Sequence, residues 1–497
     1  MQLKGLAMQR KWIVSLIVCV GVFMSSLDLF IVNIAFPAVG RHFGGASLSS
    51  LSWILSGYAI VFAALLVPAG RWADAFGRKR AFLLGLAVFV GSSAACALAP
   101  SVDFLIGARV AQAIGGALML PTSLGLMLPE FAPHERHVAI GAWAATGGIA
   151  AASGPPLGGL LVQADWRWVF LVNVPVGLLG LGFGLRLLAE RRERSALRPD
   201  LLGACGLIVA TGALVVAIVK GHEWGWGSVS VIAPLIVTVV LLALIWRRSE
   251  RHVAPVVEPA MLRVRTFGLA VGASLLFFAG FGAMLLSGVL FLTGVWHESV
   301  LTAGLMLFPG PAMATAFSIP SARLGASLGY RLPGVAGALI FAAGSIWFIA
   351  RTGDTPAFWS EYLPGSLLTG AGVGLVIPTL TGAGASSLAP ERFATGAAVL
   401  TMGRQIGVSL GVAVLVAVLG TGASSASDFH TSWLITVAGG LAAGLALAAI
   451  GPPALDAAGA DGPARPAISE PIADALIAEP LIAEPPIAEP PIAEEAA

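Results

Sequence analysis

The 497-residue sequence has few charged residues and few cysteines. Only 11% of its residues are Asp, Glu, Lys or Arg, whereas 57% are hydrophobic; an average soluble protein is roughly 25% charged. A soluble protein could not bury so much apolar surface, so the composition indicates a polytopic membrane protein. The three cysteines lie in apolar runs, which implies neither a disulfide framework nor a metal site. A nucleotide-binding loop, a nucleophile elbow and a large soluble domain are also lacking. We therefore expect no enzyme, no catalytic residues, no cofactor and no metal.

Long apolar runs dominate the sequence, and each is about the 20 residues that an α-helix needs to cross a bilayer core. The first run begins after basic residues but continues through Phe36 without a small-residue cleavage site. We interpret it as a retained span and not as a signal peptide. The pattern predicts an all-α polytopic membrane protein of fourteen transmembrane helices. The predicted spans lie near residues 12–36, 50–69, 81–99, 104–129, 138–161, 168–187, 201–219, 229–246, 267–293, 301–321, 333–350, 360–386, 394–420 and 431–451.

A short basic loop, Gly70–Arg80, joins two of these runs. Four of its residues are Arg or Lys, which places the loop in the cytoplasm by the positive-inside rule. Alternate loops agree, because one side holds twenty-one Arg and Lys residues and the other side holds four. We therefore expect a multi-pass protein of the inner (plasma) membrane with both termini in the cytoplasm. The simpler alternative is a loop that only sets topology, although Asp74 and the two glycines are not needed for that.

The second half repeats this loop. The segment Ala322–Arg331 follows Gly70–Arg80 by 252 residues and matches it at three positions, with Ala326 in place of Asp74. A duplicated helix bundle explains such a repeat and is common in transporters. The last residues are acidic and proline-rich, which is typical of disorder. The predicted domains are an N-terminal six-helix bundle at 1–190, a linker with two extra transmembrane helices at 191–250, a C-terminal six-helix bundle at 251–451 and a disordered cytoplasmic tail at 452–497.

Glycine and proline concentrate in the fifth predicted span. Two adjacent prolines remove backbone donors and should kink the helix, while small residues let membrane helices approach closely. The pattern favours a helix that bends or slides, and tight packing alone is the alternative. The residues concerned are Gly154, Pro155, Pro156, Gly158 and Gly159.

Two ionisable residues lie deep within the spans of the first half, Asp28 in the first span and Arg109 in the fourth. An ionised side chain there costs at least roughly 2.5–3.5 kcal/mol, so it usually faces a cavity and a partner. Counted from the ends of their runs at about 1.5 Å per residue, the two residues can share a depth in the membrane. A purely structural ion pair is the alternative to a functional one.

These features resemble the major facilitator superfamily, and within it the fourteen-span drug:proton antiporters of the EmrB/QacA type. The resemblance extends from about residue 12 to residue 451. The Gly70–Arg80 loop is similar to the family's signature between its second and third spans, and the fifth-span cluster is similar to its antiporter motif. Phe30 stands where the first-span motif usually has Thr. Further matching segments are Leu27–Asp28 with Ile31–Pro37, Arg109–Ala117 and Trp166–Pro175.

The resemblance implies a secondary active transporter that exports amphipathic small molecules, such as drugs and antibiotics, in exchange for protons. The tenth span has no deep carboxylate of the kind found in relatives that handle dicationic drugs, which favours neutral or monocationic substrates. The residues expected to take part in gating are Gly70, Arg71, Asp74, Gly77 and Arg78, together with the fifth-span cluster Gly154, Pro155, Pro156, Gly158 and Gly159.

Proton coupling requires a group that gains and loses a proton as the cavity changes sides. Burial of a carboxylate favours its neutral form, and a nearby guanidinium favours its charged form. Arg109 stays protonated, so its movement relative to Asp28 would switch the acid between the two forms. We predict that Asp28 is the coupling acid and that Arg109 modulates it. Asn33 and Gln112 are predicted as neutral hydrogen-bonding neighbours in the substrate cavity.

Phe277 and Phe281 are further candidates for the substrate cavity. They are four residues apart on the span that begins the second half, so they share one helix face. Aromatic faces suit amphipathic or cationic ligands. Packing in the protein interior or against lipid is the alternative.

Two other functions stay open at this stage. One is a dedicated exporter of a single endogenous metabolite or antibiotic on the same fold. The other is a channel without coupling, or a membrane receptor, although neither explains the repeat or the kinked fifth span. The expected partners are a small-molecule substrate, protons and the lipid bilayer, with no nucleic acid. The chain is expected to act as a monomer or with an accessory periplasmic adaptor.

Overall fold

The computed structural model describes residues 2–44, 46–132, 135–192, 198–389, 392–420 and 425–450. These residues are helical over almost their whole length, and none of them forms a strand. Helices are expected here because the backbone groups of a membrane span must find their hydrogen-bond partners within the segment itself. The predicted disordered tail at 452–497 lies outside the described residues.

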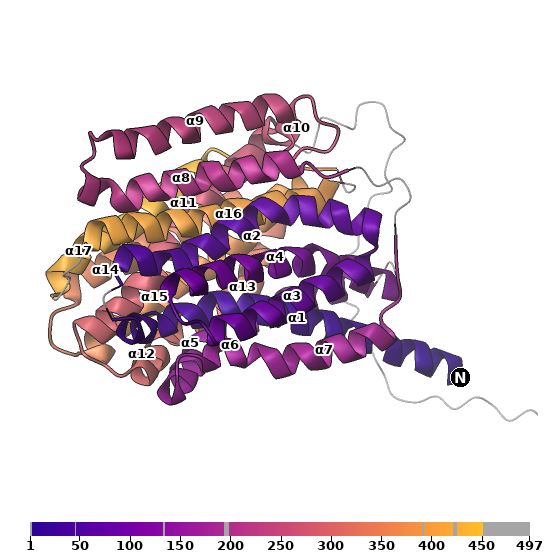
Figure 1. The fold of residues 1–497 in the computed structure, drawn as a ribbon, viewed down its shortest axis with the longest axis horizontal. Coiled ribbons are helices and arrows are strands. Elements are labelled where there is room, and N and C mark those ends of the chain that lie inside the picture. The colour runs from indigo at the N-terminus through magenta and orange to yellow at the C-terminus, as the bar shows by residue number, and fades with distance from the viewer. Residues whose placement is uncertain are drawn as a thin grey trace, which may run out of the picture. The chain divides into compact units, whose positions relative to one another are not determined.

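The helices of the first part of the chain run back and forth along one common direction (Figure 1). They are α1 (Gln2–His42), α2 (Leu48–Phe76), α3 (Arg78–Ala97), α4 (Val102–Met127), α5 (Arg136–Ala164), α6 (Trp168–Leu171) and α7 (Asn173–Leu187). Two further long helices follow, α8 (Leu201–Trp224) and α9 (Val229–Ser249). Helix α8 packs against α2, and α9 packs against α8.

The remaining helices complete the bundle. They are α10 (Pro259–Leu262), α11 (Arg265–Gly294), α12 (Val300–Leu307), α13 (Pro309–Leu328), α14 (Arg331–Arg351), α15 (Leu363–Ser386), α16 (Phe393–Leu419) and α17 (Ala426–Ala448). A short π-helix, Phe358–Tyr362, precedes α15.

All fourteen predicted spans fall on helices, with α6–α7 and α12–α13 each forming one broken span. Thirteen spans among the described residues are long and apolar enough to cross a membrane. The exception is α5, which is 29 residues long but contains Pro155 and Pro156 and is rich in glycine. These residues lower its apolar character, so its place as a fourteenth span rests on its packing against α1 and α12 within the bundle.

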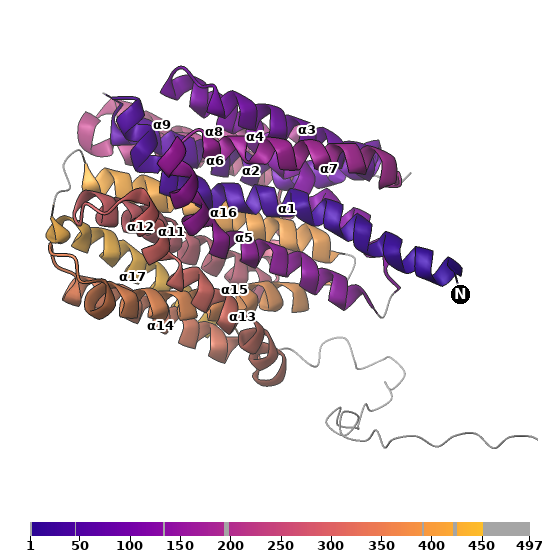
Figure 2. The ribbon, with the colours of Figure 1, turned by 90° about the horizontal axis from the view of Figure 1, so that it is seen from below.

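The first group of helices, α1–α7, and the second group, α11–α17, lie on two sides of the bundle. In the view of Figure 2, α1 and α5 of the first group and α16 of the second lie in the middle, where the groups meet. One hydrophobic cluster joins both sides, because it contains Phe36 and Val39 of α1 together with Phe291 of α11 and Trp433 of α17. These residues lie near the end of α1, the end of α11 and the start of α17. They therefore occupy the end of the bundle opposite the connection between α2 and α3.

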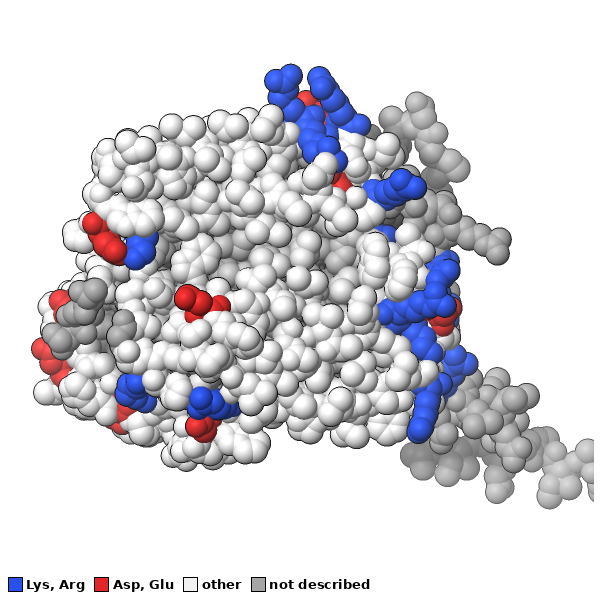
Figure 3. Space-filling model, viewed as in Figure 1, with Lys and Arg blue, Asp and Glu red and all other residues white. Residues whose placement is uncertain are grey.

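The other end, which holds the connection between α2 and α3, is called the basic end here. Lys and Arg gather there on the visible face, and most of the surface between the two ends is uncharged (Figure 3). Toward the basic end two buried cores each stay within one group of helices, whereas a third joins the groups through Val67 of α2, Phe267 of α11 and Val399 of α16. One has buried members such as Phe82 and Met119 from the first group of helices, and another has Phe277 and Phe341 from the second.

Candidate functional site

A buried ion pair joins α1 to α4. Arg109 Nη1 donates a hydrogen bond to Asp28 Oδ2. The side chains are 1% and 0% exposed, respectively. Removing one partner of such a buried pair typically costs about 3–5 kcal/mol, because the other charge is left uncompensated. The two residues predicted to couple protons are therefore in direct contact.

Gln112 lies beside the ion pair. It is three residues after Arg109 on the same face of α4. Its Nε2 donates to Asp28 Oδ1 at 3.0 Å and to Ser93 Oγ of α3 at 2.8 Å. Its Oε1 accepts from Arg109 Nη1 at 2.5 Å. The predicted neighbour Gln112 thus contacts both members of the pair. Ser93, which the sequence analysis did not single out, orients its amide.

Aromatic rings cover the guanidinium of Arg109. Its Cζ lies 4.3 Å from the ring centroid of Tyr58 and 5.8 Å from that of Phe170. Its Nε donates to the backbone oxygen of Ile54 at 3.2 Å. Sequence reasoning did not connect these three residues to the ion pair, because they come from α2 and α6, although Phe170 lies in the matching segment Trp166–Pro175. A Tyr inside an apolar run was the other available signal.

The two described partners of the Asp28 carboxylate are both N–H donors, one from Arg109 and one from Gln112. An ionised carboxylate only accepts hydrogen bonds, whereas a protonated one must also donate. The observed arrangement therefore suits the ionised acid. Withdrawal of either donor would favour the protonated form.

Asn33 lies apart from this network. It is on α1, but its Nδ2 donates to the backbone oxygen of Leu29 on its own helix at 2.7 Å. Its side chain is half-buried. No contact with the ion pair brings it into the site, and its cavity role stays a prediction.

Phe277 and Phe281 both lie in the interior of the second group of helices, with 0% and 9% of their surface exposed. The ring of Phe277 is 4.7 Å from that of Phe341 on α14, and the ring of Phe281 is 5.5 Å from that of Phe278. These contacts favour the packing alternative that the sequence left open.

The predicted gating loop is held by charges at the basic end. Asp74 Oδ1 accepts from Arg78 Nε at 2.7 Å, and Arg78 Nη1 also donates to the backbone oxygen of Gly125 on α4 at 3.2 Å. Arg71 reaches a different part of the chain, because its Nη2 donates to Glu258 Oε1 at 2.7 Å. The loop thus links α2 to α3, to α4 and to the segment before α10.

Two glycines of this loop occupy restricted positions, one because of its backbone conformation and one because of a close helix contact. Gly77 has φ of +122°, a conformation that residues with a Cβ rarely adopt. A Cβ there would also lie 2.7 Å from Glu190 Cδ. A Cβ at Gly70 would lie 3.3 Å from Pro121 Cβ. The turn and the approach of α2 to α4 both depend on these positions.

The glycines of α5 bring it against helices on both sides. A Cβ at Gly154 would lie 2.6 Å from Phe30 Cβ, and one at Gly158 would lie 2.9 Å from Ile31 Cγ1, both on α1. On the other side, a Cβ at Gly159 would lie 2.8 Å from Leu301 Cα of α12. Pro155 and Pro156 lie within this same segment of the helix. The cluster is therefore a close contact between the first and second groups of helices.

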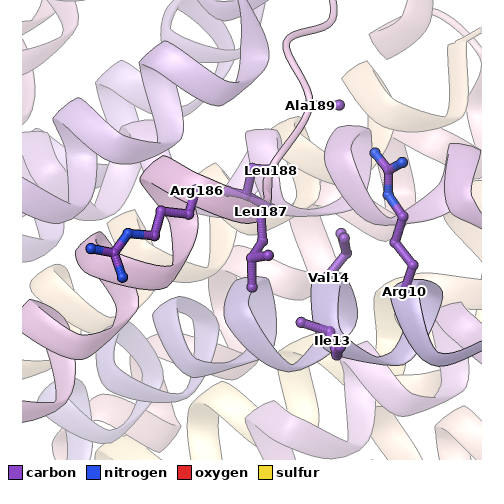
Figure 4. A pocket seen from close by; sticks show the side chains of 7 residues that line it. All are labelled: Arg10, Ile13, Val14, Arg186, Leu187, Leu188 and Ala189. Carbon is purple, nitrogen blue, oxygen red and sulfur yellow. The ribbon is translucent and has the colours of Figure 1, made fainter. Parts of the chain in front are cut away.

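A surface hollow of about 450 Å³ lies between α1 and α7 at the basic end (Figure 4). Arg10, Ile13 and Val14 line it from α1, and Arg186 to Ala189 line it from the end of α7. It contains none of the predicted site residues. It is therefore distinct from the buried ion pair.

Comparison with known proteins places this geometry in a family. A model described as Major Facilitator Superfamily matches residues 18–412. The chain is 35% identical over 427 residues to the multidrug resistance protein Stp of Mycobacterium tuberculosis (strain CDC 1551 / Oshkosh), which covers 85% of this chain and 79% of Stp. It is 34% identical over 414 residues to the tetracenomycin C resistance and export protein of Streptomyces glaucescens, covering 82% and 75% of the two chains.

The crystal structure of a D-xylose-proton symporter shares the fold, with a TM-score of 0.63 and 14% sequence identity. The match covers 89% of this chain and 98% of the symporter. At that identity the likeness concerns the arrangement of helices alone. The family model and the two sequence relatives, by contrast, extend over most of the chain. The chain belongs to the Major Facilitator Superfamily.

Proposed function

We propose that this protein is a secondary active transporter that exports amphipathic small molecules across the plasma membrane in exchange for protons. The observation that carries the proposal is the buried Asp28 carboxylate, held by Arg109 and Gln112 inside a membrane helix bundle. A charge at that position is costly and usually functional. The relatives named for multidrug resistance and for antibiotic export support the direction of transport.

Proton exchange follows from the contacts of Asp28. In the observed arrangement the ionised carboxylate accepts from Arg109 and Gln112. When α1 and α4 shift and these donors withdraw, the carboxylate is left in low-dielectric surroundings, where the neutral form is favoured. It then takes a proton from the open side. Return of the guanidinium favours the charged form, and the proton leaves.

The bodies that move are proposed to be the six-helix bundles at 1–190 and 251–451. Their shared hydrophobic cluster around Phe36 and Trp433 supports closure at the end opposite the basic end. Near the basic end the bundles touch through a smaller shared cluster, which joins Val67 of α2 to Phe267 of α11 and would have to part for access from that side. The charge pattern supports a cytoplasmic location for the basic end and for both termini. The ion pair of Asp74 and Arg78 and the glycine contacts of α5 are the proposed gates at the two ends.

The experiment is transport into proteoliposomes with an imposed pH gradient. The full chain is reconstituted, and uptake of ethidium and of tetracenomycin C is measured with and without the gradient. We expect accumulation against the concentration gradient of at least one compound, and loss of that accumulation when a protonophore is added. Equal flux with and without the pH gradient would identify an uncoupled channel and reject the proposal.

A dedicated exporter of one antibiotic is the second candidate, because one relative is named for tetracenomycin C alone. A panel of unrelated amphipathic compounds in an efflux-deficient host separates the two candidates. Protection against several classes supports the broad exporter, and protection against one supports the dedicated one. Transport by the purified chain alone would support the proposed monomer without an accessory adaptor.

A further inference from the structure

The second group of helices contains a guanidinium without a counter-ion. Arg404 lies on α16, and no Asp or Glu among the described residues comes within 4.0 Å of its nitrogen atoms. Its Nε is buried and has no hydrogen-bond partner. Arg109, the buried arginine of the first group, has Asp28 against it. A cation inside a membrane bundle normally has a partner, so Arg404 is an exception that calls for an explanation.

The contacts of Arg404 orient its guanidinium without neutralising it. Its Nη2 donates to Thr381 Oγ1 of α15 at 2.5 Å, and Thr381 in turn donates to the backbone oxygen of Ile377 at 3.0 Å. Its Cζ lies 5.4 Å from the ring centroid of Phe278 on α11. A hydroxyl and an aromatic face thus position the cation from two other helices, and both are neutral.

The packing of α16 keeps Arg404 at this place. Gly403, next to it, approaches the backbone of α11, because a Cβ there would lie 3.4 Å from the oxygen of Val271. A Cβ at Gly407 would lie 3.1 Å from Ala279 N of the same helix. The two glycines hold α16 close to α11, so Arg404 sits beside this contact and reaches across to α15.

This part of the bundle is not fully enclosed by the protein. Thr381 is exposed and Arg404 is half-buried, although its Nε is buried. Thr381 lies five residues before the end of α15, which is at the basic end. A ligand that reaches Thr381 therefore meets the half-buried guanidinium, whose Nε and neighbouring ring of Phe278 are buried and become accessible when the arginine side chain turns.

We propose that Arg404 binds an acidic group of the transported molecule, a carboxylate, sulfonate or phenolate, with Phe278 against its apolar part. The proposal rests on the proposed export function and defines its substrate class as amphipathic acids. An acidic group would accept from the guanidinium, including Nε once the side chain turns toward it, and would supply the missing negative charge. Charge-assisted hydrogen bonds of this kind are stronger than neutral ones, so the acid should bind more tightly than its uncharged ester.

The test compares 1-pyrenebutyrate with its methyl ester, which lacks the negative charge and carries one additional methyl group. Binding to the purified full chain in lipid nanodiscs is followed by energy transfer from tryptophan to pyrene. The variants are Arg404→Gln, Arg404→Lys and, as a matched control, Arg323→Gln, which removes an exposed arginine of α13. Heat-unfolding midpoints verify that each variant is folded.

We expect the wild type to prefer the acid. Arg404→Gln should weaken acid binding roughly tenfold or more, in line with the strength of hydrogen bonds to charged groups, and leave ester binding unchanged. Arg404→Lys should keep part of the preference, and Arg323→Gln should keep all of it. Equal losses of acid and ester binding, or no loss at all, would show that Arg404 only supports the structure.

Two further outcomes separate the possible causes. Loss of the acid preference when gluconate is replaced by chloride would mean that an inorganic anion is the ligand, and would overturn the inference. A wild type that binds and transports the ester without preferring the acid contradicts this inference but leaves the export function standing. A wild type that binds neither compound counts against both.

Discussion

The contact between Asp28 and Arg109 allows a double-mutant cycle with a predicted order of stabilities. Arg109→Leu removes the donor to Asp28, the donor to the oxygen of Ile54 and the cation beside the Tyr58 ring. The carboxylate is left buried with Gln112 alone, and losses of this kind are about 3–5 kcal/mol. Adding Asp28→Asn removes the uncompensated charge. The double variant should therefore be more stable than Arg109→Leu alone.

The assay is heat unfolding of the four proteins, wild type, both single variants and the double variant, in one detergent. Residues in contact typically show a coupling of about 0.5–3 kcal/mol, and the buried position of this pair favours the upper part of that range. Arg109→Leu is expected to have the lowest unfolding midpoint. Additive effects, with the double variant the least stable of the four, would refute the reasoning that the two charges compensate each other.

Three other predictions concern the gates and the aromatic residues. Gly159→Ala should impair transport far more than Gly147→Ala, because the new methyl group meets the backbone of α12 at 2.8 Å in the first case and only a hydroxyl at 3.9 Å in the second; equal transport rates would argue against the contact. Asp74→Asn breaks a half-buried ion pair, whose loss costs at most about 1 kcal/mol of stability. Membrane insertion and yield should therefore stay normal while transport falls. Full transport by this variant would show that the loop only sets membrane topology. Phe277→Ala should lower the folded yield, because a core cavity costs about 3–5 kcal/mol, and should not change which compounds are exported. An altered substrate profile in a stable variant would instead show that Phe277 lines the substrate cavity.

Much of the fold could be predicted because membrane spans have a simple requirement, a long apolar run. The helix α5 shows the limit of that rule. Its prolines and glycines make it less apolar than the other spans, yet the same residues let it fit between α1 and α12. The sequence showed the glycine–proline cluster but could not show which helices it contacts.

The site was predictable only in part, for a similar reason. Asp28 and Arg109 stand out as rare charges in apolar runs, and Gln112 lies in the family-like segment that begins at Arg109. Tyr58 and Ser93 come from other helices, so nothing in their spacing connects them to the pair. Arg404 was visible as a cation within a span, but the absence of a carboxylate beside it became apparent only from the packing of α11, α15 and α16. The expectation of neutral or monocationic substrates rested on the lack of a deep carboxylate in the tenth span. It did not take the uncompensated charge of Arg404 into account.

Proton release on substrate binding tests the central claim most directly. Purified wild type and Asp28→Asn are mixed with an exported compound in weakly buffered detergent solution, and the pH change is recorded with an indicator dye. The account predicts that the wild type releases protons, whereas Asp28→Asn binds the compound but releases none, because an amide keeps the shape of the acid and cannot titrate. Equal proton release by the variant, together with export driven by a pH gradient, would place the coupling site elsewhere and contradict the account.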